Sequence, residues 1–149
     1  MKTRDLVRMF CYRGECLYEW ANAPFRFAGL LHATDGCVLV WRDATPRDGR
    51  FPEAERDRAG KIVSAHPGAK ACRRRWPTTA ARRRTHTLHL PSHEVRFPGM
   101  SVDAMYRDRI ARLGRIVGKP VLYALPDSWD KPIYFVCGPW SGALMGLRK

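Results

Sequence analysis

Two arginine triplets are the residues whose type and spacing most directly predict a binding chemistry. Arg73-Arg74-Arg75 and Arg82-Arg83-Arg84 flank the short segment 76–81. Guanidinium groups this close together repel one another unless an anion neutralises them, and the planar guanidinium fork matches the oxygens of phosphate. The triplets therefore indicate a polyanionic partner, and nucleic acid is the first expectation.

The predicted nucleic-acid-binding residues belong to this basic segment and to a helix farther along the chain. Trp76 lies between the triplets, where it could stack on an unpaired base or anchor the segment on the protein's own core. Arg107 and Arg115 fall outside the apolar side of the expected helix. The predicted set is Lys70, Arg73, Arg74, Arg75, Trp76, Arg82, Arg83, Arg84, His86, Arg107 and Arg115.

The positive charge is concentrated in one part of the sequence. Residues 58–93 contain nine of the 27 basic residues and no acidic residue, in a chain of net charge +13. RNA is slightly favoured over DNA, because irregular arginine-rich segments commonly become ordered on RNA. We expect the protein to be a structural component of a ribonucleoprotein. One alternative is a protein–protein adaptor that binds acidic partners. Another is that the run of basic residues is a solvated or disordered basic loop without a partner.

Histidine, cysteine and glutamate side chains suggest weaker chemical hypotheses. His86, His89 and His93 are close in sequence, but His86 and His89 point to opposite faces of a strand, so no metal or other cofactor is expected. Cys11 and Glu19 are residue types found in nucleophilic and acid–base sites, yet their spacing defines no site. No catalytic residue is assigned, and the sequence favours a binding protein over an enzyme.

Two short elements near the N-terminus carry a family resemblance. Leu17-Tyr18-Glu19-Trp20 and Phe25-Arg26-Phe27-Ala28-Gly29-Leu30 are similar to the YEW and FAGLW elements of the SRAP family, whose members cross-link to abasic sites in single-stranded DNA. The resemblance implies catalytic roles for Glu19 and His66. An enzyme on single-stranded DNA or RNA, a cross-linker or a nuclease, is therefore the rival hypothesis. Lys2 stands where the family has its nucleophilic cysteine.

The elements that must position these residues form a single α+β domain over residues 1–149, with a small antiparallel or mixed sheet and two helices. Thr34-Asp35-Gly36 is a hairpin signal, because glycine supplies the positive φ that a tight turn requires. Strands are expected at 5–12, 16–20, 25–31, 37–41, 85–90, 121–125 and 133–137.

Two helices and an arm complete the prediction. Pro52 favours a first helix over residues 52–65. The second helix covers residues 101–117, with Ser101 as its N-cap and Gly118 after its last turn. Its apolar side from 102 to 117 is expected to support the core, and Arg109 falls on that side, so its charged head must find water or a partner. The extended arginine-rich arm lies at about 67–84, where Pro77 prevents a continuous helix.

Cysteine usage and hydropathy indicate the compartment. The five cysteines are an odd number and include no C-x-x-C pair, which fits a reducing environment better than a disulfide scaffold. The apolar stretches are far shorter than the ~20 residues that span a membrane, and the N-terminus lacks the apolar region of a signal peptide. We expect an intracellular protein without a membrane partner.

Overall fold

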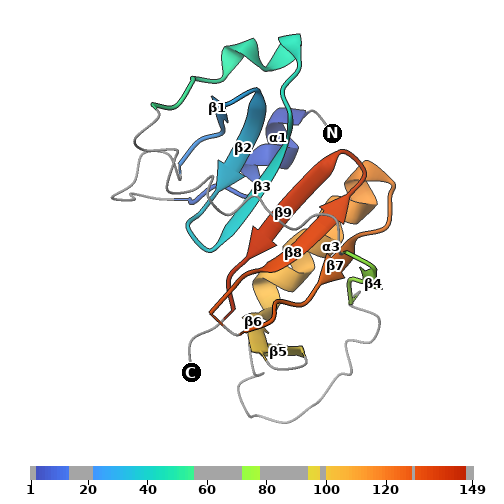
Figure 1. The fold of residues 1–149 in the computed structure, drawn as a ribbon. Coiled ribbons are helices and arrows are strands. Elements are labelled where there is room, and N and C mark those ends of the chain that lie inside the picture. Colours follow the sequence, from blue (N-terminus) through green and yellow to red (C-terminus); the bar gives the residue numbers. More distant parts are fainter. Residues whose placement is uncertain are drawn as a thin grey trace.

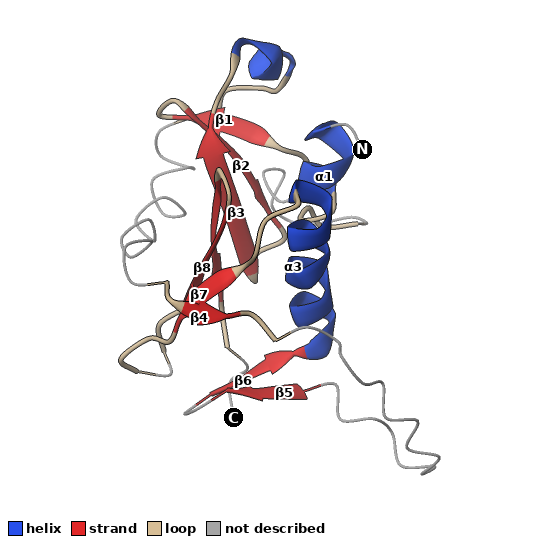
Figure 2. Ribbon diagram, turned by 90° about the vertical axis from the view of Figure 1, so that its right-hand side faces the viewer, coloured by secondary structure: helices blue, strands red, loops and turns tan. Residues whose placement is uncertain are grey.

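The computed structural model describes residues 3–13, 22–55, 72–77, 94–97, 100–128 and 130–146. Within these residues the protein is α+β, as predicted: a seven-stranded sheet and a separate two-stranded hairpin accompany two α-helices. Figure 1 shows the sheet, and Figure 2 shows that both α-helices lie on the same side of it.

The seven-stranded sheet joins the N-terminal and C-terminal parts of the chain. Its strands follow the order β1-β2-β3-β9-β8-β7-β4, and β3 pairs with β9 through contacts such as Val40 opposite Gly142. Every neighbouring pair is antiparallel. The bounds are β1 Phe25–Phe27, β2 Leu30–Thr34, β3 Val38–Asp43, β4 Arg74–Arg75, β7 Leu122–Ala124, β8 Ile133–Cys137 and β9 Trp140–Leu144.

The two helices cover one face of this sheet. Helix α1 is Thr3–Arg8 and helix α3 is Ala104–Val117. Strands β5 (Glu94–Phe97) and β6 (Met100–Asp103) form the separate hairpin, and β6 leads directly into α3. Apolar side chains of α1 and α3 enter the same core as alternate residues of the strands, because burying apolar area is the main stabilising term. The buried side chains from the helices are Leu6, Val7, Ile110, Ala111 and Leu113.

The predicted hairpin at Thr34-Asp35-Gly36 is confirmed. Gly36 has a φ of 96°, in the left-handed region that favours glycine. The Asp35 Oδ1 atom accepts hydrogen bonds from the backbone N–H groups of Cys37 and Val38, at 2.9 and 3.1 Å. The strands predicted at 121–125 and 133–137 are also present, as β7 and β8.

The strand predicted at 5–12 is wrong, because Thr3–Arg8 form helix α1. Leu6, Val7 and Phe10 share one side of the chain at helical spacing, and all three are buried. Packing of this side against the sheet outweighs the strand propensity of the segment, which is weak and depends on context. The predicted partner strand at 16–20 lies outside the described residues.

The segment expected as one strand at 25–31 is a hairpin of β1 and β2. Ala28 and Gly29 connect the strands with φ values of 51° and 76°. Positive φ at both central residues is the requirement of a type I′ turn, which usually has asparagine or aspartate first. Alanine has no such preference, so the turn was not predicted.

Both helix predictions need correction at their N-terminal ends. Residues 52–55 are not helical: the N–H of Arg26 donates to the Pro52 carbonyl, and the N–H of Ala54 donates to the Arg26 carbonyl, each at 2.8 Å. The rest of the predicted first helix lies outside the described residues. Helix α3 begins at Ala104 instead of Ser101, because Asp103 caps it by accepting the Met105 N–H at 2.7 Å. The predicted end at Gly118 is confirmed by its φ of 70°.

Candidate nucleic-acid interface

The first arginine triplet lies at the edge of the sheet. Arg73, Arg74 and Arg75 are exposed, and β4 is the last strand in the sheet order. The Arg73 N–H donates to the Tyr123 carbonyl at 3.2 Å, and the Trp76 N–H donates to the Val121 carbonyl at 2.9 Å. The backbone of the triplet is therefore fixed against β7, as Figure 1 shows. Charged side chains on an edge strand also discourage pairing with a second chain.

The triplet presents charge to both faces of this edge. Arg74 is opposite Tyr123, which belongs to the core on the helix side, and Arg75 is opposite Leu122. Because consecutive side chains of a strand point to opposite faces, Arg74 lies on the helix side and Arg75 on the other. A polyanion that follows the edge can therefore contact both.

Trp76 anchors this strand in the core. Its side chain is only 4% exposed. The ring packs against Phe97, Tyr123 and Phe135, with centroids 5.4, 5.6 and 5.9 Å away. The indole Nε1–H donates to the Arg107 carbonyl of α3 at 3.0 Å. This placement agrees with the anchor interpretation and contradicts stacking on a base, since a stacked base needs an open ring face.

Helix α3 and the turn that follows it add basic residues beside the same anchor. Arg115 and Lys119 line a cavity of about 230 Å³ together with Trp76 and Gly114. Lys119 was not predicted as a binding residue. Its position directly after Gly118, and four residues after the predicted binding residue Arg115, is the signal that could have identified it. The six residues Arg73, Arg74, Arg75, Arg107, Arg115 and Lys119 are named the β4–α3 basic surface.

Most cations of the β4–α3 basic surface have no acidic partner. Within the described residues, Arg73, Arg74, Arg75, Arg115 and Lys119 form no ion pair, and Arg107 Nε pairs with Asp108 at 2.9 Å. The other ion pairs among the described residues lie elsewhere in the fold and join Arg26 to Glu53, Arg42 to Asp48 and Arg109 to Asp35. Among the described residues, the positive charge of this surface is therefore paired only at Arg107.

Arg109, on the apolar side of α3, forms an ion pair with Asp35. Its Nη1 lies 3.1 Å from Asp35 Oδ2, and its guanidinium lies 5.3 Å from the centre of the Tyr106 ring. The Tyr106 hydroxyl donates to the same carboxylate oxygen at 2.8 Å. Burial, together with this hydrogen bond to a negative group, raises the pKa of Tyr106. The cluster ties α3 to the β2–β3 hairpin, so its role is structural.

Of the residues considered for catalysis, Cys11 is described, whereas Glu19 and His66 lie outside the described residues. Cys11 is buried, and its Sγ donates to the Val7 carbonyl at 3.7 Å. Burial raises its pKa to about 11, so the thiolate that a nucleophile needs is scarce at neutral pH. In the described part of the chain, no three histidine, cysteine or acidic side chains gather as a metal site.

Several sequence-predicted residues lie outside the described ranges. Of the predicted arm at 67–84, only residues 72–77 are described, and they form a docked edge strand with its flanks. The predicted or implied residues outside the described ranges are Lys2, Glu19, His66, Lys70, Arg82, Arg83, Arg84, His86, His89 and His93.

Two further observations concern the membrane and the comparison with known proteins. Among the described helices, none is both long and apolar enough to cross a membrane. Comparison with protein-family models, with curated proteins and with solved structures found no match for this chain.

Proposed function

We propose that the protein binds nucleic acid through the β4–α3 basic surface and serves as a structural component of a ribonucleoprotein. The supporting observation is the row of exposed arginines on β4 that have no ion-pair partner among the described residues. Such cations are stabilised by phosphates, and release of the phosphates' counterions drives association.

The anchoring of β4 supports a structural role. The hydrogen bond from Trp76 to the Arg107 carbonyl fixes β4 relative to α3. Because the backbone of the two elements is already ordered, binding a phosphate backbone costs little conformational entropy of the protein. RNA is the favoured partner because β4 offers arginines on an exposed edge instead of a helix that fits a DNA major groove.

We also place the protein in a reducing intracellular compartment. The cysteines that the structure describes, Cys11, Cys37, Cys72 and Cys137, are free thiols. Free thiols persist where glutathione and thioredoxin keep them reduced.

The test is a binding comparison with a charge-matched control. The variant Arg73→Ala/Arg74→Ala/Arg75→Ala removes three cations of the surface. The control Arg4→Ala/Arg8→Ala/Arg13→Ala removes three exposed cations of the α1 region. Fluorescence anisotropy with labelled single-stranded RNA, single-stranded DNA and polyglutamate of equal charge measures each Kd at one salt concentration.

We expect the β4 variant to bind RNA at least tenfold more weakly than the control, because hydrogen bonds to charged groups contribute ~1.5–3 kcal/mol each. Equal loss in both variants would contradict a defined surface. Binding of polyglutamate as tight as that of RNA would favour the adaptor hypothesis over the proposed function.

A further inference from the structure

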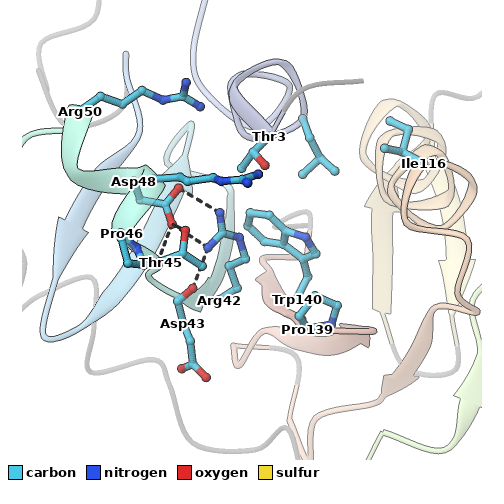
Figure 3. A pocket seen from close by; sticks show the side chains of 12 residues that line it. Thr3, Arg42, Asp43, Thr45, Pro46, Asp48, Arg50, Ile116, Pro139 and Trp140 are labelled. Carbon is cyan, nitrogen blue, oxygen red and sulfur yellow. Dashed lines mark hydrogen bonds and ion pairs between the residues drawn. The ribbon is translucent and has the colours of Figure 1, made fainter.

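A second cationic site lies away from β4, in a pocket beside the 3-10 helix η2 (Pro46–Arg50). The pocket has a volume of about 1090 Å³ and is formed by the start of α1, the end of β3, η2, the last turns of α3 and the β8–β9 turn. Figure 3 shows its side chains. It is named the η2 pocket, and Arg42, Arg47, Arg50, Thr3, Ile116 and Trp140 are among its lining residues.

One wall of the η2 pocket is rigid. Arg42 donates to both carboxylate oxygens of Asp48, at 2.8 and 3.0 Å. The N–H and hydroxyl of Thr45 donate to Asp48 Oδ2, at 2.7 and 2.9 Å. On its other side, the Arg42 guanidinium lies 5.1 Å from the centre of the Trp140 ring. The charge of Asp48 is therefore satisfied within the wall and does not neutralise the remaining cations of the pocket.

Arg47 and Arg50 supply the available positive charge. They are three residues apart in η2, and side chains at this spacing eclipse one another in a 3-10 helix, so both project to the same side. Both line the pocket, both are exposed, and neither forms an ion pair within the described residues. In Figure 3 the Asp43 carboxylate points away from Arg50 and Thr3.

Two guanidinium groups that project to the same side of η2 match a ligand that carries two negative charges, and phosphate oxygens fit their fork geometry. The pocket is larger than a phosphate needs, and its volume of about 1090 Å³ lies just above the ~300–1,000 Å³ range of small-molecule sites. Leu6, Ile116 and Pro139 line the remaining space with apolar groups. A molecule with a phosphate and a less polar body therefore fits better than a bare anion.

We propose that the η2 pocket binds a phosphorylated small molecule, whose phosphate is held by Arg47 and Arg50 and whose body rests against Leu6, Ile116 and Pro139. None of these residues belongs to the β4–α3 basic surface. The site is thus separate from the proposed nucleic-acid interface and stands whether or not the protein binds nucleic acid.

The test titrates AMP, adenosine and inorganic phosphate into the isotopically labelled protein and follows amide and indole NMR signals. AMP is expected to shift the signals of Thr3, Thr45 and the Trp140 indole. Adenosine is expected to bind roughly tenfold or more weakly, because it lacks the charge-assisted contacts. Absence of AMP binding, or inorganic phosphate binding as tightly as AMP, would overturn the proposal.

Two double variants show whether the arginines of η2 are responsible. Arg47→Ala/Arg50→Ala should weaken AMP binding roughly tenfold or more, while Arg8→Ala/Arg13→Ala, which removes equal charge outside the pocket, should leave it unchanged. RNA binding should be the same in both. If the η2 variant lost RNA affinity as strongly as Arg73→Ala/Arg74→Ala/Arg75→Ala, the pocket would be part of the nucleic-acid surface and the proposal would be wrong.

Discussion

At the scale of single residues, the Arg42–Asp48 pair is a largely buried ion pair with two hydrogen bonds between its partners. Asp48 is 1% exposed, and its carboxylate receives hydrogen bonds from both Arg42 and Thr45. Burial alone raises the pKa of Asp48, but these donors outweigh it and lower the pKa from 3.8 to about 2. The charged form is thus favoured in the folded state.

The Arg42–Asp48 pair predicts that the free energy of unfolding decreases at acidic pH. A depressed folded-state pKa contributes stability that is complete above the unfolded value of 3.8 and is lost as the pH falls toward about 2. The expected loss is about 2 kcal/mol. Urea unfolding between pH 6 and 2 should show it in the parent protein, and Asp48→Asn should remove that part of the pH dependence. An unchanged pH profile in Asp48→Asn would contradict the charged pair.

Gly142 gives a second prediction at this scale. A Cβ atom at this position would overlap the buried ring of Phe135. We expect Gly142→Ala to lower the free energy of unfolding by ~1–3 kcal/mol, as overpacking does. Gly49→Ala is the control, because nothing lies within 4 Å of its added Cβ. Equal melting temperatures for the two variants would show that β8 and β9 do not pack as described.

At the scale of elements, β4 depends on Trp76 more than on its own short pairing. The strand has only two residues, whereas the indole contacts aromatic side chains of β5, β7 and β8. We therefore expect Trp76→Ala to cost ~3–5 kcal/mol in unfolding free energy. Chemical denaturation measures this cost. A variant with unchanged stability but weakened RNA binding would instead restore the base-stacking role.

Local signals account for the elements that could be predicted from sequence. The Asp35-Gly36 turn and the Gly118 helix end each depend on a glycine with positive φ, so their sequence signature is strong. Helix α1 and strand β9 depend on packing partners that are distant in sequence. In α1 the buried residues are only Leu6 and Val7, with Phe10 just after the helix, too short a pattern to distinguish a helix from a strand.

The candidate sites likewise include residues that a local sequence pattern predicts and residues that come together only on folding. The clustered arginines of β4 were evident from sequence because they are consecutive. For Trp76, the sequence left stacking and anchoring equally open, since both need an aromatic residue and only burial distinguishes them. The η2 pocket was not predicted, because Thr3, Arg47, Ile116 and Trp140 meet only in the folded chain.

At the scale of the whole molecule, acidic side chains pair with some of the described basic side chains and not with others. Ion pairs neutralise Arg26, Arg42 and Arg109, while the arginines of β4 have no such partners among the described residues. A net charge of +13 favours association with polyanions in general. On the proposed function, the cations of β4 direct this general attraction to one edge of the sheet.

The salt dependence of RNA binding tests this central claim most directly. If about six cations each neutralise one phosphate, a plot of log K against log salt concentration should have a slope near −4 for single strands. Arg73→Ala/Arg74→Ala/Arg75→Ala should reduce the magnitude of that slope by about 2, and Arg4→Ala/Arg8→Ala/Arg13→Ala should leave it nearly unchanged. A slope near zero in the parent protein, or equal changes in both variants, would contradict binding of phosphates at the β4–α3 basic surface.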